Sequence, residues 1–167
     1  MDIRIAGTVE DSIVDGPGLR FVVFVQGCPH HCEGCHNPET HDFSAGKLTT
    51  TDALYEMCME NPLCSGVTFS GGEPFCQPES LYELGSRFKA AGKHLMCYSG
   101  WTFEELLKKS GREEYVGKLL SILDVLVDGR FDISKRSLSL LFRGSSNQRL
   151  IDVHASLTNG EAVELPE

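Results

Sequence analysis

Short apolar runs alternate with amphipathic segments along most of this chain. Nearly continuous apolar and β-branched runs, typical of strands buried on both faces, occur at 20–26, 66–70, 93–98 and 125–127. Between these runs, helical periodicity and capping residues predict helices at 49–61, 78–91, 102–110 and 113–123. Farther on, Asn159-Gly160 predicts a hairpin turn between the segments 149–157 and 162–165.

Strands that alternate with helices predict a parallel sheet with helical crossovers, and hence an α/β fold. The chain has 167 residues, too few for the roughly 250 of a complete eight-unit barrel. We therefore expect a partial, open TIM-like barrel of parallel strands with outer helices, built as a single domain over 1–167, with a C-terminal tail at about 151–167 whose role the sequence does not define. In such folds the chemistry gathers at the C-terminal ends of the strands, where the unusual motifs of this chain lie.

Composition and charge argue against several classes of protein, among them nucleic-acid-binding, membrane-spanning and secreted proteins. The formal charge of −9 disfavours a nonspecific grip on nucleic acid, and no apolar run is long enough to span a membrane. The N-terminus lacks the basic and then apolar pattern of a secretion signal, so we expect a cytoplasmic protein. Seven cysteines, an odd number, point to metal binding or chemistry rather than to a disulfide framework.

Three of these cysteines, Cys28, Cys32 and Cys35, lie in the run GCPHHCEGC with the spacing Cys-x3-Cys-x2-Cys. No fourth cysteine lies at a comparable distance, although structural zinc sites and electron-transfer clusters normally take four protein ligands. Three thiolates on a four-iron cluster leave one iron open, and open metal positions are where substrates bind. Zinc is an alternative, with a histidine as fourth ligand from the set His30, His31, His36 and His41. The other cysteines, Cys58, Cys64, Cys76 and Cys97, are scattered and are not expected to form a second cluster. Cys58, in a predicted helix, and Cys97, in a predicted strand, are expected to be small core residues.

Two glycine-rich segments flank the predicted strands. Ser70-Gly71-Gly72-Glu73-Pro74 follows the second strand and is either a tight turn or a place of close backbone approach to a ligand. Exposed carbonyls beside the Glu73 carboxylate would suit an ammonium group. Asp15-Gly16-Pro17-Gly18 is expected to be a turn, and 143–148 (RGSSNQ) a surface loop.

Together these motifs resemble the radical S-adenosylmethionine superfamily. The stretch VDGPGLRFVVFVQGCPHHCEGCHNPETHDF is similar to that of glycyl-radical-enzyme activases. LVDGRF followed by LFRGSSNQ resembles, more specifically, the activating proteins of anaerobic ribonucleoside-triphosphate reductase.

The resemblance implies that Cys28, Cys32 and Cys35 ligate a [4Fe-4S] cluster whose fourth iron chelates S-adenosyl-L-methionine. Gly34, Cys35 and His36 would line this cofactor, and Gly71, Gly72 and Glu73 would hold its methionyl ammonium. Reductive cleavage would give a 5′-deoxyadenosyl radical, which would generate a glycyl radical on the reductase.

The implied partners are the glycyl-radical subunit of the reductase and an electron donor of the flavodoxin or ferredoxin type, with no nucleic acid and no membrane. Three alternatives stay open: an activase of another glycyl-radical enzyme such as pyruvate formate-lyase, a non-catalytic iron–sulfur carrier, and a zinc-binding module.

Overall fold

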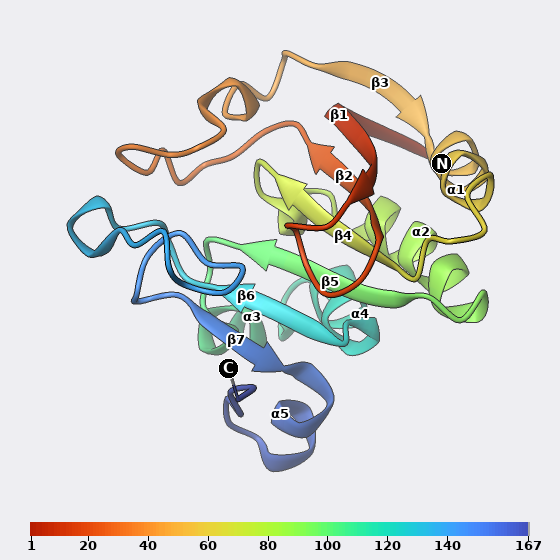
Figure 1. Ribbon diagram of the computed structural model, residues 1–167. Helices are drawn as coiled ribbons and strands as arrows, with labels where there is room; N and C mark the ends of the chain where they lie inside the picture. The colour runs from red at the N-terminus through yellow and green to blue at the C-terminus, as the bar shows by residue number, and fades with distance from the viewer. Residues whose placement is uncertain (167) are drawn as a thin grey trace.

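Four parallel strands form the middle of a seven-stranded sheet in the computed structural model, which describes residues 1–166. The strand order is β3-β1-β2-β4-β5-β6-β7 (Figure 1). The parallel strands are β2 (Arg20–Val25), β4 (Gly66–Gly71), β5 (His94–Ser99) and β6 (Val125–Asp128). Antiparallel strands flank them: β1 (Asp2–Ser12), β3 (Lys47–Thr50) and β7 (Arg149–Asp152). The sheet is therefore mixed and ends in β3 on one side and β7 on the other.

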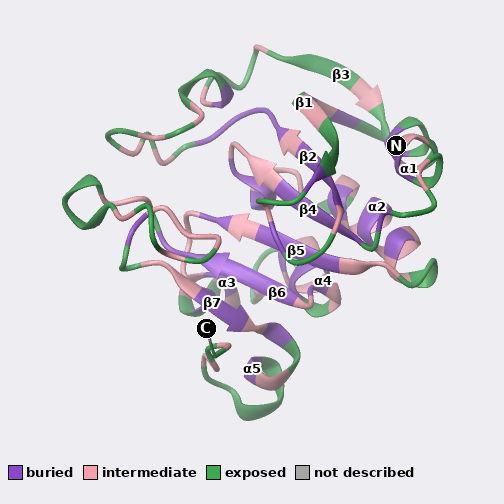
Figure 2. Cartoon of the chain, in the orientation of Figure 1, coloured by how far each residue is buried: buried purple, intermediate pink, exposed green. Residues whose placement is uncertain are grey.

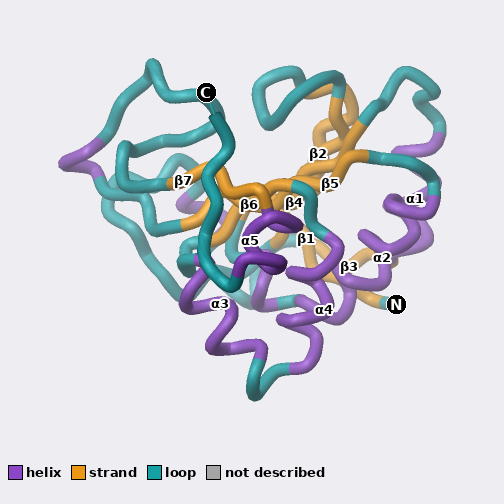
Figure 3. The backbone as a smooth tube through the Cα atoms, turned by 90° about the horizontal axis from the view of Figure 1, so that it is seen from below, coloured by secondary structure: helices purple, strands orange, loops and turns teal. Residues whose placement is uncertain are grey.

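Helices cover one face of this sheet. In Figure 3 the first four lie together below the strands: α1 (Thr51–Met59), α2 (Pro78–Ala90), α3 (Phe103–Ser110) and α4 (Glu114–Ile122). α5 (Val153–Asn159) follows β7 and contacts α4. The main core lies between helices and sheet, where Phe21, Phe69, Leu84 and Phe88 are fully buried. Burial of these side chains is the dominant favourable contribution to folding.

The opposite face has a smaller core of its own near the β7 end of the sheet. Met96, Val125, Val127 and Leu150 are buried there, and Tyr98, Phe142 and Leu165 pack against them. The central strands are thus mostly buried, whereas much of β1 and β3 is exposed (Figure 2). The near-continuous apolar runs in the sequence reflect this burial on both faces.

The predicted central elements are confirmed, and the predicted helices fall within a few residues of α1 to α4. The sheet is not wholly parallel, however, because β1, β3 and β7 pair antiparallel at its two sides. β1 and β3 were not predicted, whereas β7 lies within the predicted segment 149–157. β1 is largely exposed in its second half, and β3 is a four-residue edge strand that is mostly exposed. Neither carries the continuous apolar run that identified the buried strands.

The hairpin turn predicted at Asn159-Gly160 is wrong. Asp152 caps the N-terminus of α5 by accepting a hydrogen bond from the backbone N–H of Ala155, and Gly160 ends the helix in the left-handed conformation with φ of 76°. An Asn-Gly pair favours positive φ in both a hairpin turn and a helix C-cap, so local sequence alone did not separate the two.

Within residues 1–166, no helix is both long enough and apolar enough to cross a bilayer.

Candidate functional site

A cavity of about 520 Å³ opens at the C-terminal ends of β2, β4, β5 and β6. The loop that carries the cysteines and the 129–148 loop, between β6 and β7, both project from this side of the sheet (Figure 1). The wall includes Cys28, Cys32, Cys35, His30, His36 and His41 from the first loop and Phe131, Leu140, Phe142 and Gly144 from the second. Backbone-rich segments of β4 and β5 complete it with Ser70, Gly71, Gly72, Ser99 and Gly100.

The three clustered cysteines all line this cavity as free thiols. Cys28 is buried just beyond β2, and its backbone N–H donates to the carbonyl of His41, 3.2 Å away. Cys32 and Cys35 are half-buried, and the N–H of Asn37 donates to Sγ of Cys35 at 3.4 Å. Hydrogen bonds to sulfur of this kind tune and stabilise iron–sulfur clusters. The donor set therefore fits a thiolate-bound cluster.

Burial raises the pKa of the Cys28 thiol and that of the Cys32 thiol above the usual value. Both thiols are therefore protonated near neutral pH in the metal-free chain. Because metal ligation requires thiolates, metal binding at this site must release protons. Residues 1–166 contain no group of three His, Cys, Asp or Glu side chains arranged to hold a single metal ion.

His30 joins the cysteine loop to the glycine-rich segment after β4. Its Nε2 lies 2.7 Å from Oε1 of Glu73, and both side chains are almost fully buried. The His30 ring also packs edge-on against Trp101 at 4.7 Å between ring centroids. The sequence listed His30 only as one of four histidines near the cysteines. Its contact with Glu73, 43 positions away, could not be read from local pattern.

The Glu73 carboxylate is the centre of a buried network. Besides His30, it accepts hydrogen bonds from the hydroxyl of Ser99 and from the backbone N–H groups of Phe75 and Gly100. Glu73 is not among the described residues that line the cavity. Its hydrogen bonds therefore connect the C-terminal ends of β4 and β5 to the cysteine loop.

Gly71 and Gly72 lie in the cavity wall, and both positions require glycine. Gly71 has φ of 92°, and a Cβ there would lie 2.7 Å from the backbone N of Val25. A Cβ at Gly72 would lie 2.4 Å from the carbonyl oxygen of Gly27. The two glycines thus allow β4 to pass close to β2 and leave backbone exposed to the cavity.

Gly34 is the point where the cysteine loop meets the 129–148 loop. Its φ is 74°, and a Cβ there would lie 2.7 Å from Cδ1 of Ile133. Gly34 itself is not among the described lining residues, whereas its neighbours Cys35 and His36 are. The His36 ring packs against Phe131 at 5.3 Å between centroids.

The Asp15-Gly16-Pro17-Gly18 segment is packed around a fully buried arginine, Arg20. The guanidinium of Arg20 donates to the carbonyl of Pro17 at 2.8 Å, and the hydroxyl of Thr68 donates to the carbonyl of Asp15 at 2.8 Å. A Cβ at Gly16 would lie 2.7 Å from the Arg20 side chain. The predicted turn is therefore held in place by Arg20 and Thr68, and its residues Val14 and Asp15 line the cavity.

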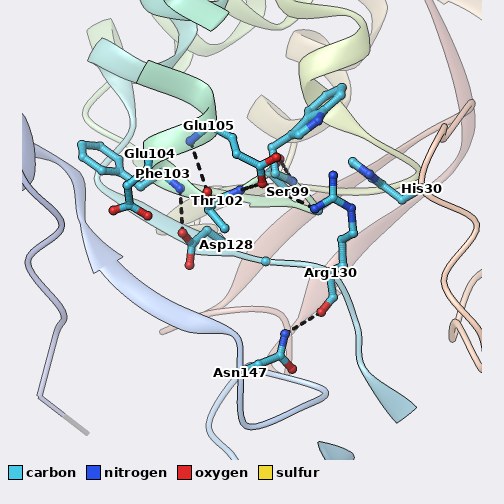
Figure 4. A network of polar contacts seen from close by, with 12 residues as sticks. His30, Ser99, Thr102, Phe103, Glu104, Glu105, Asp128, Arg130 and Asn147 are labelled. Carbon is cyan, nitrogen blue, oxygen red and sulfur yellow. Dashed lines mark hydrogen bonds and ion pairs between the residues drawn. The ribbon is translucent and has the colours of Figure 1, made fainter. Parts of the chain in front are cut away.

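The RGSSNQ segment, for which the sequence offered only a surface loop, is bonded to the end of β6. Gln148 accepts from the N–H groups of Gly144 and Ser145 and donates to the carbonyl of Gly129. Asn147 donates to the carbonyl of Arg130 (Figure 4). These side-chain bonds hold the 129–148 loop against the sheet beside the cavity.

A second buried carboxylate, Asp128, lies at the end of β6. It accepts a hydrogen bond from the backbone N–H of Phe103, in the first turn of α3 (Figure 4). It also accepts hydrogen bonds from the guanidinium of Arg149. These bonds raise the pKa of Arg149 further above its already high value. The pair fixes α3 and β7 relative to the cavity.

Comparison with known proteins agrees with this site. Residues 14–151 match the family model described as a 4Fe-4S single cluster domain. The chain belongs to this 4Fe-4S family. It is 34% identical over 143 residues to the anaerobic ribonucleoside-triphosphate reductase-activating protein of Enterobacteria phage T4, which covers 82% of this chain and 86% of that protein. The protein of the same name from Haemophilus influenzae is 34% identical over 146 residues, covering 81% of this chain and 89% of the relative.

A pyruvate formate-lyase-activating enzyme from Clostridium pasteurianum is 40% identical over 114 residues, covering 63% of this chain and 48% of that enzyme. The resemblance to glycyl-radical-enzyme activating proteins is therefore confirmed. Membership of a 4Fe-4S family also supports an iron–sulfur cluster over the zinc alternative.

In this 4Fe-4S domain, His30→Leu is expected to lower the free energy of unfolding of the metal-free protein by about 2 kcal/mol. The change leaves the buried Glu73 carboxylate without one of its donors, and hydrogen bonds to charged groups contribute roughly 1.5–3 kcal/mol. The measurement is urea unfolding under anaerobic, reducing conditions. His31→Asn is the control, because His31 has φ of 50° and Asn tolerates that conformation. Equal stability of the two variants would contradict the assigned role of His30.

Proposed function

We propose that this chain is a radical S-adenosylmethionine enzyme, a single domain over 1–167 acting in the cytoplasm, which activates anaerobic ribonucleoside-triphosphate reductase. The observation that carries the proposal is the meeting of Cys28, Cys32 and Cys35 with the Gly71-Gly72 backbone around one cavity. When bound, a [4Fe-4S] cluster and S-adenosylmethionine supply one-electron cleavage of a sulfonium bond and a carbon radical able to take hydrogen from a glycine. Similarity to the phage and Haemophilus activating proteins over most of their length supports the reductase as partner.

The chain's own residues would divide the work of binding. The thiolates of Cys28, Cys32 and Cys35 would hold three irons and leave the fourth for the cofactor. Gly71 and Gly72 would bring backbone carbonyls to its ammonium group, with the Glu73 carboxylate holding their turn in place and adding negative charge beside it. Gly34, Cys35 and His36 would border the cofactor on the side of the 129–148 loop.

The rest of the cavity would protect reactive species from water. Phe24, Phe131, Leu140 and Phe142 contribute apolar side chains to the wall. An enzyme of this class must place a reactive carbon and exclude competing reactions, which apolar walls do by excluding solvent. A flavodoxin or ferredoxin would supply the electron, and neither nucleic acid nor a membrane is needed as partner.

Activation of pyruvate formate-lyase is the second candidate. It is favoured by the 40% identity to the clostridial enzyme, although the matched region is only 48% of that enzyme. A non-catalytic iron–sulfur carrier would be the remaining alternative.

The test is anaerobic reconstitution with iron and sulfide, reduction, and addition of S-adenosylmethionine. We expect 5′-deoxyadenosine to form, and a glycyl-radical EPR signal to arise on added anaerobic reductase. A signal on pyruvate formate-lyase instead would favour the second candidate. An intact cluster that cleaves no cofactor would overturn the enzymatic proposal.

A further inference from the structure

The 129–148 loop carries an exposed strip of apolar and basic side chains. Leu138 is 84% exposed, Leu141 46% and Ile133 44%, which is unusual for large apolar residues. Lys135 and Arg136 are exposed in the same loop. We call this set of five residues, Ile133, Lys135, Arg136, Leu138 and Leu141, the basic ridge.

The charge of this loop is opposite to that of the chain. Residues 129–148 contain four basic residues and one acidic residue, a formal charge of +3 within a chain of −9. Arg130 is paired with Glu105, whereas neither Lys135 nor Arg136 makes an ion pair with any residue in 1–166. The ridge therefore presents two cationic side chains to solvent beside apolar side chains, and Asp132 of the same loop offsets part of the charge of Lys135 without forming an ion pair.

The ridge is held in a fixed position beside the cavity. The N–H of Ser146 donates to the carbonyl of Lys135 at 2.9 Å, and Arg136 pairs with Ser145 in an isolated β-bridge. Ile133 lies over Gly34 of the cysteine loop. Leu140, Phe142 and Gly144 of the same loop line the cavity itself. A protein docked on the ridge would therefore have its adjoining segment at the cavity mouth.

We propose that the basic ridge docks an acidic, apolar-flanked surface of the glycyl-radical partner and so places that partner's glycine segment at the cavity. The inference rests on the proposed function and adds the docking surface and its chemistry. Complementary charge on the rim of an interface raises the association rate and fixes its orientation. Exposed leucines at the same place supply the apolar area that a specific contact needs.

Other occupants fit the ridge less well. A symmetric pair of copies of this chain would bring the two ridges together and oppose like charges. Nucleic acid is disfavoured because the ridge has only two basic side chains without an ion pair, and the rest of the chain is strongly acidic and would repel phosphates. An acidic surface of a protein partner satisfies both the charge and the apolar side chains.

The test uses Lys135→Glu/Arg136→Glu in the reconstituted protein. Lys47→Glu/Arg112→Glu is the matched control, because it changes the net charge equally at two exposed residues outside the loop. Each protein is assayed first for 5′-deoxyadenosine formed with dithionite and no reductase. Glycyl-radical yield is then measured by EPR against the concentration of anaerobic reductase at low salt.

We expect unchanged cleavage without the reductase in all proteins. With the reductase, the ridge variant should need about tenfold more partner for half-maximal radical yield, and the control should match the wild type. Because salt screens exposed charges, high salt should raise the reductase concentration that the wild type needs toward that of the ridge variant. Leu138→Ser should also raise the reductase concentration needed for half-maximal radical yield, but the effect of salt on that concentration should stay as in the wild type.

Two failures are distinguishable. Absence of cofactor cleavage in the wild type would overturn the proposed function itself. Normal cleavage with the same reductase dependence in wild type and ridge variant would overturn the docking proposal alone. Two further results would also overturn the docking proposal. If the ridge variant lost only the cofactor cleavage that flavodoxin drives, the ridge would belong to the electron donor. If the ridge variant changed only the self-association of the chain in sedimentation, the ridge would be a contact between copies of this chain.

Discussion

Cys32→Ala is expected to abolish cluster assembly and, with it, cleavage of S-adenosylmethionine. The spacing leaves three candidate thiolates for a cluster that normally takes four ligands, so no spare cysteine in the motif can replace Cys32. Loss of residues that only support a metal ligand typically costs 10–100-fold, so loss of a ligand itself should exceed about 100-fold. The measurements are iron and acid-labile sulfide per chain after reconstitution, followed by 5′-deoxyadenosine formation.

Cys76→Ala is the matched control. Cys76 is a half-buried free thiol, and it is not one of the described residues that line the cavity. Burial raises the pKa of the Cys76 thiol to about 12, which makes it a poor source of thiolate. We expect Cys76→Ala to retain the cluster and the activity. A Cys32→Ala protein with normal iron and sulfide and normal cofactor cleavage would refute the ligand assignment.

Arg20→Met is expected to lower the free energy of unfolding by roughly 3–5 kcal/mol. Arg20 is completely buried and has no carboxylate partner within hydrogen-bonding distance in residues 1–166. Its guanidinium donates to the hydroxyl of Thr68 and to the carbonyls of Pro17, Val67 and His94. Burial lowers its pKa to about 10, so the side chain stays charged at neutral pH. Met fills part of the volume but leaves these acceptors without their donor.

The measurement is denaturant unfolding of the metal-free protein. Arg112→Met, at an exposed position after α3, is the control and is expected to change stability by less than about 0.5 kcal/mol. Similar stabilities of the two variants would refute the role of Arg20 as the support of the 15–18 turn. If Arg20→Met folds, it should also bind S-adenosylmethionine more weakly, because Val14 and Asp15 lose their fixed position in the cavity wall.

Local pattern was sufficient for the centre of the fold. The buried strands β2, β4, β5 and β6 are continuous apolar runs. The helices between them show helical spacing, and threonines cap the N-termini of α1 and α3. Parallel strands joined by helices bring their C-terminal ends to one edge, so the position of the cysteines beside Gly71-Gly72 was also predictable. The sheet edge formed by β1 and β3 was not, because these strands depend on a neighbouring strand rather than on their own apolar content. β7 falls within the predicted segment 149–157, but its antiparallel pairing with β6 was not predicted.

The sequence by itself determined the chemistry at the centre of the site: three thiols at a characteristic spacing, on a loop after a buried strand, facing a glycine turn. Only the tertiary structure decided what supports that chemistry. The contact of His30 with Glu73, the bonds of Arg20 to β4 and β5, and the bond of Gln148 to Gly129 join residues 19 to 74 positions apart. Such contacts depend on the directions of side chains after the sheet has formed. A buried polar group then takes whichever partner the packing brings near, because leaving it unpaired is costly.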